Sequence, residues 1–323
     1  MKLASLKSGR DGALVVVSRD LKSACFAAPV AQTMQEALDR WDEIEGQLGT
    51  LYDELNSGKA NAGFAFEIDT VAAPLPRSFQ YLDGACYLSH IRRNREARGD
   101  TLPEDILDAP LVYQGISHGF GAWNDPITGL NEADMIDFEA EIAAITGDVP
   151  MGIGAEEATR HIRLFCLLQD TSLRRIIPPE LKRSFGFLTG KPASYLGPIA
   201  VTPDELGELW DGKMVGGTMQ CTVRGKVIGE INTGIDSPFH YGHMIAHVAQ
   251  TRAFEAGTIV GLGTVSNEDN KAGFGCIGEY RAQEIISTGS PTLDFLCKGD
   301  WIRIELLGPD GESVMGAVDQ SVG

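Results

Sequence analysis

The sequence predicts an α+β protein rich in β-strands, in which a small N-terminal α/β domain precedes a larger body. An amphipathic helix follows a valine-rich strand near the N-terminus, and a proline-stiffened stretch separates both from a series of short strand-like runs. We place the small domain at residues 1–73 and the larger one at 74–323. A chain of 323 residues that is 43% hydrophobic is long enough to bury a large core.

The N-terminal elements are marked by their end signals. Residues 13–18 (ALVVVS) predict a strand. A helix is expected from Thr33, which forms a capping box with Glu36, and apolar residues then recur at spacings of three and four. The sequence Asn-Ser-Gly at 56–58 ends this helix, and residues 71–76 (VAAPLP) predict an extended connection.

The larger body shows strand and helix signals in mixed order. Residues 137–145 alternate between acidic and apolar side chains, which predicts a strand. The other elements that we expect are helices over 156–168, from a capping box at Thr202 and over 237–252, and strands over 196–201, 258–261 and 301–307.

Charge and composition exclude several classes of partner. The formal net charge is −18 and no cluster of Lys and Arg stands out, which argues against nucleic acid and against anionic membranes. No apolar run approaches the roughly 20 residues that span a bilayer, and the first residues lack the apolar core of a signal peptide. The six cysteines are scattered without a CxxC pair, which predicts reduced and mostly buried thiols. We therefore expect a cytoplasmic protein.

Glu139 and Glu141 lie two residues apart on the predicted strand, so their side chains project from the same face. Two carboxylates with Cα atoms about 7 Å apart repel each other unless a cation lies between them. Oxygen ligands favour Mg²⁺ or Ca²⁺ over zinc, and Mn²⁺ is also acceptable. From this segment alone, an edge strand with a solvated acidic face is the better explanation.

Other charged residues are weaker signals when each is taken alone. Asp170 and Arg174 are four apart, a spacing that an ordinary surface ion pair also explains. Lys191 follows a glycine but does not fit the phosphate-binding loop pattern. Three histidines have the spacing of a metal-binding helix: His240, His243 and His247. Because the glutamate of the HExxH motif is missing, we favour helix packing for them over zinc hydrolysis.

Taken in chain order from about residue 76, these segments resemble the fumarylacetoacetate hydrolase family. Four motifs carry the resemblance: DFEAE at 137–141, DTSLR at 170–174, GK at 190–191 followed by GP at 197–198, and GTVS at 263–266. Residues 83–90 (DGACYLSH) and 274–279 (FGCIGE) are similar to segments of true fumarylacetoacetases, and the small N-terminal module resembles that of bacterial members.

The resemblance implies a mixed β-roll with a metal site at its mouth, in a homodimer. It implies hydrolysis of a C–C bond in a small anionic β-diketo acid, foremost fumarylacetoacetate, which gives fumarate and acetoacetate in tyrosine breakdown. The implied metal ligands are Asp83, Glu139, Glu141 and Asp170. His90 would be the general base oriented by Glu279, Arg174 and Lys191 would offset charge developing on oxygen, and Tyr113 and Thr264 would contact the substrate.

The chain also departs from the family pattern. The vertebrate enzymes have a glutamine shortly after the arginine of D-x-S-x-R, whereas residues 175–179 here are RIIPP. Related activities therefore stay open: an acylpyruvate hydrolase, an oxaloacetate decarboxylase, or a 2-oxo-dienoate hydratase or isomerase. A non-catalytic binding protein that keeps the fold and a structural ion is the alternative from another class.

Overall fold

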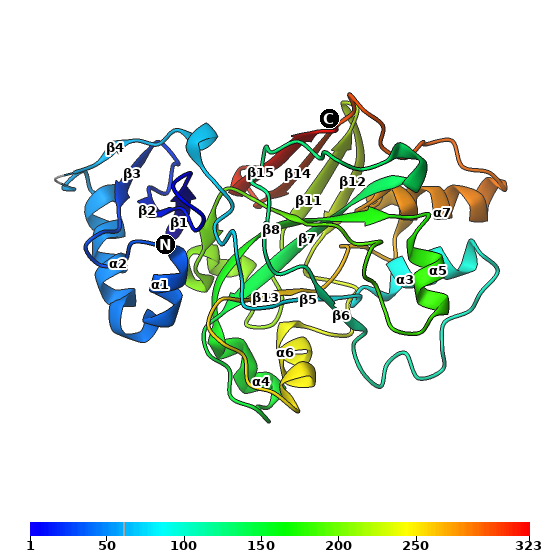
Figure 1. Cartoon of the computed structure of the whole chain (residues 1–323), viewed down its shortest axis with the longest axis horizontal. Helices are drawn as coiled ribbons and strands as arrows, with labels where there is room; N and C mark the ends of the chain where they lie inside the picture. The colour runs from blue at the N-terminus through cyan, green and yellow to red at the C-terminus, as the bar shows by residue number, and fades with distance from the viewer. Residues whose placement is uncertain (61) are drawn as a thin grey trace.

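The computed structural model describes residues 1–60 and 62–323 and has the expected strand-rich α+β architecture (Figure 1). The strands are β1 (Lys2–Leu6), β2 (Ala13–Val17), β3 (Ser23–Phe26), β4 (Phe64–Ala65), β5 (Tyr81–Gly84), β6 (Val112–Gly115), β7 (Ile136–Thr146), β8 (Ile162–Leu173), β9 (Tyr195–Leu196), β10 (Ala200–Val201), β11 (Thr218–Val223), β12 (Lys226–Asn232), β13 (Thr258–Gly261), β14 (Trp301–Leu307) and β15 (Ser313–Ser321). The helices are α1 (Met34–Asp39), α2 (Trp41–Asn56), α3 (Leu88–Glu96), α4 (Ala155–Ala158), α5 (Ile177–Lys182), α6 (Tyr241–Ala249) and α7 (Ile277–Thr288). The predicted fold class is confirmed.

Two sheets form the frame. The larger has the order β4-β3-β2-β1-β10-β8-β7-β13-β5-β6, with β9 paired to β8, and the smaller has the order β12-β11-β14-β15. The β13–β5 pair is parallel and the β7–β8 and β7–β13 pairs are antiparallel, so the large sheet is mixed. Apolar side chains from both sheets, such as Phe138 and Leu167 of one and Ile304 of the other, share one core.

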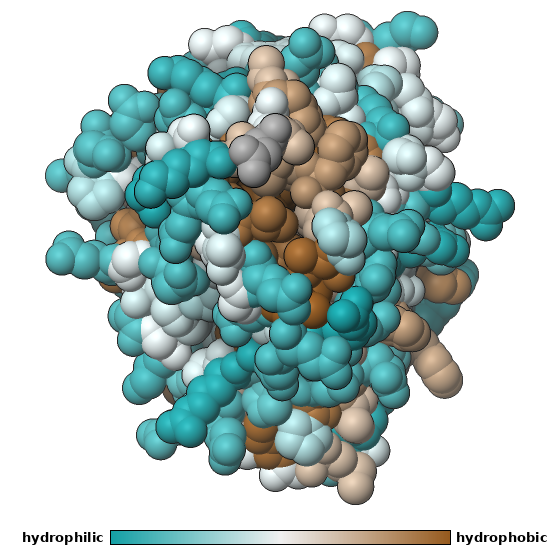
Figure 2. All heavy atoms as spheres, turned by 90° about the vertical axis from the view of Figure 1, so that its left-hand side faces the viewer, coloured by the Kyte–Doolittle hydropathy of each residue, from teal (hydrophilic) through white to brown (hydrophobic). Residues whose placement is uncertain are grey.

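The N-terminal region continues the large sheet rather than forming a sheet of its own. Strand β1 pairs with β10 in the register Lys2↔Val201, and α1 and α2 pack their apolar residues against β1–β3 in a second core. The domain boundary near residue 73 stays a prediction. Figure 2 shows the outer face of this region, where apolar side chains gather near the centre within hydrophilic surroundings.

Strand β7 lies in the middle of the sheet, between β8 and β13, and all of its residues are buried. A solvated edge strand at Glu139 and Glu141 is therefore wrong. The helix expected over 156–168 is also wrong, because α4 ends at Ala158 and strand β8 begins at Ile162. A central strand buried on both faces is an almost continuous apolar run, and such a run carries no period that separates strand from helix.

The N-terminal helix differs from its prediction only in detail. The Thr33 side chain accepts a hydrogen bond from the Glu36 backbone N–H, as expected of the cap, but the helix is divided at Arg40 into α1 and α2. The helix expected over 237–252 is shorter, because His240 caps α6, which runs only from Tyr241 to Ala249.

The element after Thr202 is a 3₁₀ turn over Pro203–Leu209, interrupted at Gly207, which has φ 54°. Thr202 makes no side-chain cap there; its hydroxyl instead accepts from the amino group of Met1. The predicted strand over 196–201 is split into β9 and β10 around a glycine and a proline that lacks the N–H a strand needs. The strands at 258–261 and 301–307 are confirmed.

Five of the six cysteines are buried, as expected, whereas Cys297 is exposed. Within residues 1–60 and 62–323, no helix has both the length and the apolar character to cross a membrane.

We predict that the packing of Phe165, on β8, against two aromatic side chains contributes strongly to the stability of the fold. Phe165 is fully buried, with ring centroids 4.8 Å from Trp210 and 5.3 Å from Tyr241. Phe165→Ala should lower the free energy of unfolding by about 3–5 kcal/mol, measured by denaturant titration. Phe185→Ala removes the same ring from a fully exposed position and should change the free energy of unfolding by less than about 0.5 kcal/mol. Similar losses in both variants would contradict this role of Phe165.

Candidate active site

Three carboxylates from three strands converge at one point of the large sheet. Glu141 of β7, Asp170 of β8 and Asp83 of β5 each offer an oxygen within 4.8 Å of the others. Strand β13 lies between β7 and β5 and has Gly261 opposite Asp83. A Cβ at residue 261 would lie 2.5 Å from Asp83 Oδ1 and 3.0 Å from Glu141 Oε2, so only glycine leaves the carboxylates room to meet.

Several oxygens of this cluster are buried without a hydrogen-bond donor: Asp83 Oδ1 and both carboxylate oxygens of Glu141. Burial, together with the charge of Asp170, raises the pKa of Asp83 to about 8. Burial and the neighbouring carboxylates Asp83 and Asp170 also raise the pKa of Glu141 well above its usual range. Orphaned carboxylate oxygens at this spacing fit a hard divalent cation, which would replace the missing donors and favour the ionised forms.

Glu139 lies beside this cluster and is already held by two cations. Arg174 Nη2 donates to Glu139 Oε1 at 2.7 Å, and the Lys191 ammonium donates to the other oxygen of Glu139 and to Asp170. Burial alone would raise the pKa of Glu139, but the charges of Lys191 and Arg174 outweigh burial and hold this pKa well below its usual range. The structure thus brings Asp83, Glu141 and Asp170 into one set and gives Glu139 different partners.

Asp170 is held in place by neutral donors as well. Ser194 Oγ donates to its Oδ1 at 2.6 Å, and the Tyr113 hydroxyl donates to its Oδ2 at 2.9 Å. Ser194 has no local sequence signal, because a lone serine three residues after Lys191 fits no motif. The Tyr113 ring packs edge-on against Phe187 at 5.0 Å, so this tyrosine links the carboxylate cluster to the loop before Lys191.

His90 and Glu279 meet across the interface of α3 and α7. His90 Nδ1 lies 2.9 Å from Glu279 Oε2, and His90 Nε2 lies 4.0 Å from Glu139 Oε1 and 3.3 Å from the side-chain nitrogen of Asn94. A carboxylate at Nδ1 selects the tautomer that has the proton on Nδ1, which leaves Nε2 free to accept one. The two residues that the resemblance paired are in contact.

A buried network that the sequence did not reveal supports this pair. Arg93 Nη1 and Ser266 Oγ each donate to Glu279 Oε1 at 2.6 Å. Burial would raise the pKa of Glu279, but hydrogen bonds from His90 and Ser266 and the charge of Arg93 lower it below its usual value. Arg93 lies in a run of basic residues on a short helix, which in sequence is typical of a solvated surface.

Asp137 fastens the strand to the helix that carries Glu279. Its carboxylate accepts from the backbone N–H groups of Ile277 and Gly278 at 2.9 and 2.8 Å and from Arg174 Nε at 2.8 Å. Arg174 is thereby fixed between Asp137 and Glu139, with its planar guanidinium aligned by both. This role of the first acidic residue of the DFEAE segment was not predicted.

Most of the predicted site residues border one cavity of about 600 Å³. Eight of the residues predicted for the site line it: Asp83, His90, Tyr113, Glu139, Glu141, Arg174, Lys191 and Thr264. Asp170 and Glu279 lie behind them, where each contacts residues that face the cavity.

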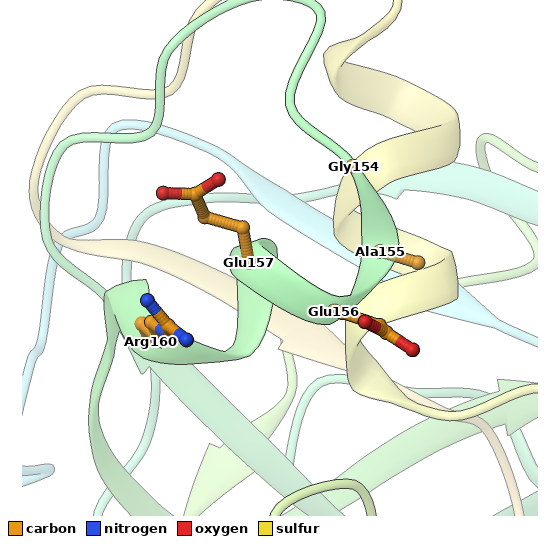
Figure 3. Close-up of a pocket in the computed structure, with 5 residues that line it drawn as sticks. All are labelled: Gly154, Ala155, Glu156, Glu157 and Arg160. Atoms are coloured by element: carbon orange, nitrogen blue, oxygen red, sulfur yellow. The ribbon is translucent and has the colours of Figure 1, made fainter.

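A second hollow, at the start of α4, has no such convergence. Gly154, Ala155, Glu156, Glu157 and Arg160 line it, and Figure 3 shows the two glutamates pointing away from each other. Two histidines of the HxxHxxxH segment have structural roles, because His240 accepts a hydrogen bond from the Gly242 backbone N–H and His243 accepts one from the His240 backbone N–H.

Comparison with known proteins places this geometry in context. The chain is 24% identical over 200 residues to the mitochondrial oxaloacetate tautomerase FAHD2B of Homo sapiens, a match that covers 61% of this chain and 55% of that protein. The chain thus spans about half the length of the curated relatives it matches.

Solved structures share the fold at low sequence identity. A fumarylacetoacetate hydrolase from the psychrophilic Exiguobacterium antarcticum has a TM-score of 0.65 at 17% identity, covering 100% of this chain and 99% of its own. A maleylpyruvate hydrolase from Sphingobium sp. SYK-6, in complex with manganese(II) and pyruvate, has a TM-score of 0.64 at 16% identity, covering 100% and 98%.

Family matches account for almost the whole chain. The family described as "Fumarylacetoacetase N-terminal domain 2" matches residues 1–77, and "Fumarylacetoacetate (FAA) hydrolase C-terminal" matches residues 80–322. The order of the four motifs, the converging carboxylates and these matches agree: the chain belongs to the fumarylacetoacetate hydrolase family.

Proposed function

We propose that this protein is a metal-dependent hydrolase that cleaves a C–C bond in a β-diketo acid. The observation that carries the proposal is the His90–Glu279 contact of 2.9 Å, which presents His90 Nε2 to the cavity beside the carboxylate cluster. A base oriented by a buried carboxylate is the arrangement that activates water.

The cation would be held by Asp83, Glu141 and Asp170, whose oxygens already converge. Glu139 as a fourth ligand stays a prediction, because in this structure Arg174 and Lys191 occupy its oxygens. When bound, a divalent cation supplies Lewis-acid stabilisation of negative charge on the substrate oxygens. The related maleylpyruvate hydrolase structure contains manganese, which supports Mn²⁺ beside Mg²⁺ and Ca²⁺ as candidates.

The hydrolysis can be written for this chain's own groups. His90 Nε2 takes a proton from water while Nδ1–H stays hydrogen-bonded to Glu279. The hydroxide oxygen bonds to one carbonyl carbon of the substrate, and the π electron pair of that carbonyl moves to its oxygen, from which it returns when the next bond breaks. The C–C bond to the central carbon then breaks, and its electron pair leaves as an enolate. The proton on His90 returns to that carbon. One water is consumed, and the products are a ketone and a carboxylic acid, which ionises by releasing its proton to solvent.

Arg174 and Lys191 line the cavity and are fixed by their carboxylate partners. Fixed cations stabilise negative charge on oxygen without having to reorganise, so these two residues would favour the addition step. Substrate contacts by Thr264 and Tyr113 stay predictions; both line the cavity, although the Tyr113 hydroxyl already donates to Asp170.

A second candidate is proton transfer without cleavage, because the human relative is an oxaloacetate tautomerase. The same base could move a proton between the enol oxygen and the carbon next to the 2-oxo group, so that enol and keto forms interconvert with no C–C bond broken. The other family activities, the homodimer, the place in tyrosine breakdown and the cytoplasmic location also stay predictions.

Turnover with and without a chelator tests the reaction class. Purified protein with Mn²⁺ or Mg²⁺ should bleach the absorbance of fumarylacetoacetate or of an acylpyruvate and release one ketonic product and one acid, and EDTA should stop both. Loss of oxaloacetate enol with no diketone cleaved would replace hydrolysis by tautomerisation, and release of CO₂ would replace it by decarboxylation.

His90→Ala separates the base from the cation site. We expect kcat to fall by about 10²–10⁴, the usual contribution of a general base, while calorimetry shows cation affinity close to that of the parent. His118→Ala changes an exposed histidine that does not line the cavity and is the matched control. An equal loss of cation affinity and turnover would place His90 among the ligands instead.

Cation binding should stabilise the protein more at high pH. The pKa of Asp83 is raised to about 8 in the folded chain against about 3.9 when unfolded, so its contribution to stability is full below about pH 4 and is lost as pH rises through 8. A cation binds the ionised carboxylates, so protons compete less as pH rises. The increase in Tm with Mn²⁺ should therefore be larger at pH 8 than at pH 6.

Glu141→Gln should abolish most of this increase, whereas Glu157→Gln changes an exposed carboxylate outside the cavity and should preserve it. An increase in Tm that is independent of pH, or equal in both variants, would contradict cation binding at this cluster.

A further inference from the structure

A second group of metal-ligating side chains lies beside the carboxylate cluster. A ring nitrogen of His90, a carboxylate oxygen of Glu139 and the sulfur of Cys276 lie within 4.8 Å of one another. His90 is on α3, Glu139 is on β7 and Cys276 directly precedes α7, and the two helices lie together at one end of the molecule (Figure 1). The group shares no residue with the cluster of Asp83, Glu141 and Asp170. Each set is therefore a candidate site of its own.

The ligand types of the second group differ from those of the carboxylate cluster. Thiolate and imidazole ligands select zinc over Mg²⁺, Ca²⁺ and Mn²⁺, which prefer oxygen. Three protein ligands with a fourth position left for water are the ligand count of an open zinc site. Zinc bonds of 2.0–2.3 Å in a tetrahedron place the ligand atoms about 3.3–3.8 Å apart, so these side chains need to move inward by on the order of 1 Å.

His90 already has the orientation of a zinc ligand. Its Nδ1 lies 2.9 Å from Glu279 Oε2, which leaves Nε2 for an ion. Nε2 lies 4.0 Å from Glu139 Oε1 and 3.3 Å from the side-chain nitrogen of Asn94. A histidine that binds a metal through one nitrogen usually donates the other N–H to a carboxylate or a carbonyl. The nitrogen proposed as the base is thus also the nitrogen that an ion would take.

Cys276 is fully buried and is the N-cap residue of α7, a helix of 12 residues. Its sulfur accepts a hydrogen bond from the Glu279 backbone N–H at 3.2 Å, and the positive end of a helix dipole favours a thiolate. Burial and the charge of Asp137 nevertheless raise the pKa of the Cys276 thiol well above its usual range, so the thiol is protonated in the free protein. Binding of an ion therefore forms a metal–sulfur bond and releases one proton to solvent.

An ion can reach this group from the cavity. His90 and Glu139 line the cavity wall, and Cys276 lies behind them. Arg174 donates to one oxygen of Glu139 and Lys191 to the other. Because each carboxylate oxygen can accept at two positions, both oxygens keep a position for an ion.

We propose that Cys276, His90 and Glu139 form a zinc site separate from the carboxylate cluster, and that zinc bound there inhibits the enzyme. The inhibition rests on the proposed function, because an ion on His90 Nε2 occupies the lone pair that takes a proton from water. The zinc site itself does not depend on which reaction the protein catalyses. A hard cation at the carboxylate cluster would then support turnover, and zinc at the second site would suppress it.

Cobalt absorption tests the site without reference to activity. Co²⁺ added to EDTA-treated, dialysed protein should give the near-ultraviolet charge-transfer band of a thiolate ligand, and Zn²⁺ should displace it. Cys276→Ser keeps a good N-cap acceptor and should lack the band, with Tm as the check on folding. Cys297→Ser removes the exposed thiol and should keep the band. No band in the parent protein, or a band that survives Cys276→Ser, overturns the site.

Two further variants test whether the sites are separate. His90→Ala should weaken Co²⁺ binding at the thiolate band by more than about 100-fold, since loss of an outer partner of a ligand alone costs 10- to 100-fold. Glu141→Gln removes a carboxylate of the other cluster and should leave this affinity within about fivefold, below that range. Excess Mg²⁺ should leave the band in place. Loss of the band in Mg²⁺, or equal weakening in both variants, would place the ions in one site and overturn the proposal.

Zinc inhibition is measured on the Mn²⁺-loaded protein with whichever substrate it turns over. The zinc concentration that halves each protein's own zinc-free rate should be at least about tenfold higher for Cys276→Ser than for the parent and for Cys297→Ser. If no substrate is turned over, the proposed function fails, and the cobalt band still decides the zinc site. Equal inhibition of Cys276→Ser and the parent would overturn the inhibitory role, because zinc would then act at the carboxylate cluster.

Discussion

The crowding of buried carboxylates on neighbouring strands is the constraint on which the site depends. Asp83, Glu141 and Asp170 are far apart in sequence and come within 4.8 Å because β5, β13, β7 and β8 are adjacent in the sheet. Three like charges removed from water at this separation are unfavourable unless positive charge is close. Lys191 supplies one such charge to Asp170, and the remaining oxygens fit a divalent cation. Gly261 is part of the same constraint, since a side chain there would fill the gap.

The sheet and the helices have different tasks in the proposed site. The paired strands β5, β7 and β8 carry the carboxylates Asp83, Glu141 and Asp170, whereas the helices α3 and α7 carry His90 and Glu279. Asp137 joins the two parts, because its carboxylate binds both the first N–H groups of α7 and the guanidinium of Arg174. A shift of α7 relative to β7 would thus disturb the histidine's partner and the arginine together.

Sequence patterns predicted the parts of this arrangement that depend on local periodicity. Alternation along the 137–145 strand placed Glu139 and Glu141 on one face, and the structure places both at the cavity. Periodicity failed at 156–168, where the apolar run of a strand buried on both faces looked helical. Contacts between distant segments were visible only through the family resemblance, as for His90 with Glu279.

Arg93 and Ser194 were missed because neither has a local signal, and their importance arises from partners more than twenty residues away. For Glu139, the alternation predicted which face of the strand carries the side chain. A sequence pattern cannot show that Arg174 and Lys191, rather than the carboxylate cluster, would hold the Glu139 oxygens.

The inner and outer ends of the cavity are built from different side chains, so they can vary independently. Charge at the inner end is set by Asp83, Glu139, Glu141 and Lys191, which are buried, and a substitution there alters the balance of the whole cluster. The outer wall combines apolar side chains such as Ile285 and Leu181 with the arginines Arg95 and Arg281. His90 and Ile91 are neighbours on α3, and Glu279 and Ala282 lie one turn apart on α7, so the same two helices position the base and shape the outer wall. A change of side chain in the outer turns alters the wall alone, whereas a movement of either helix alters both the wall and the position of the base.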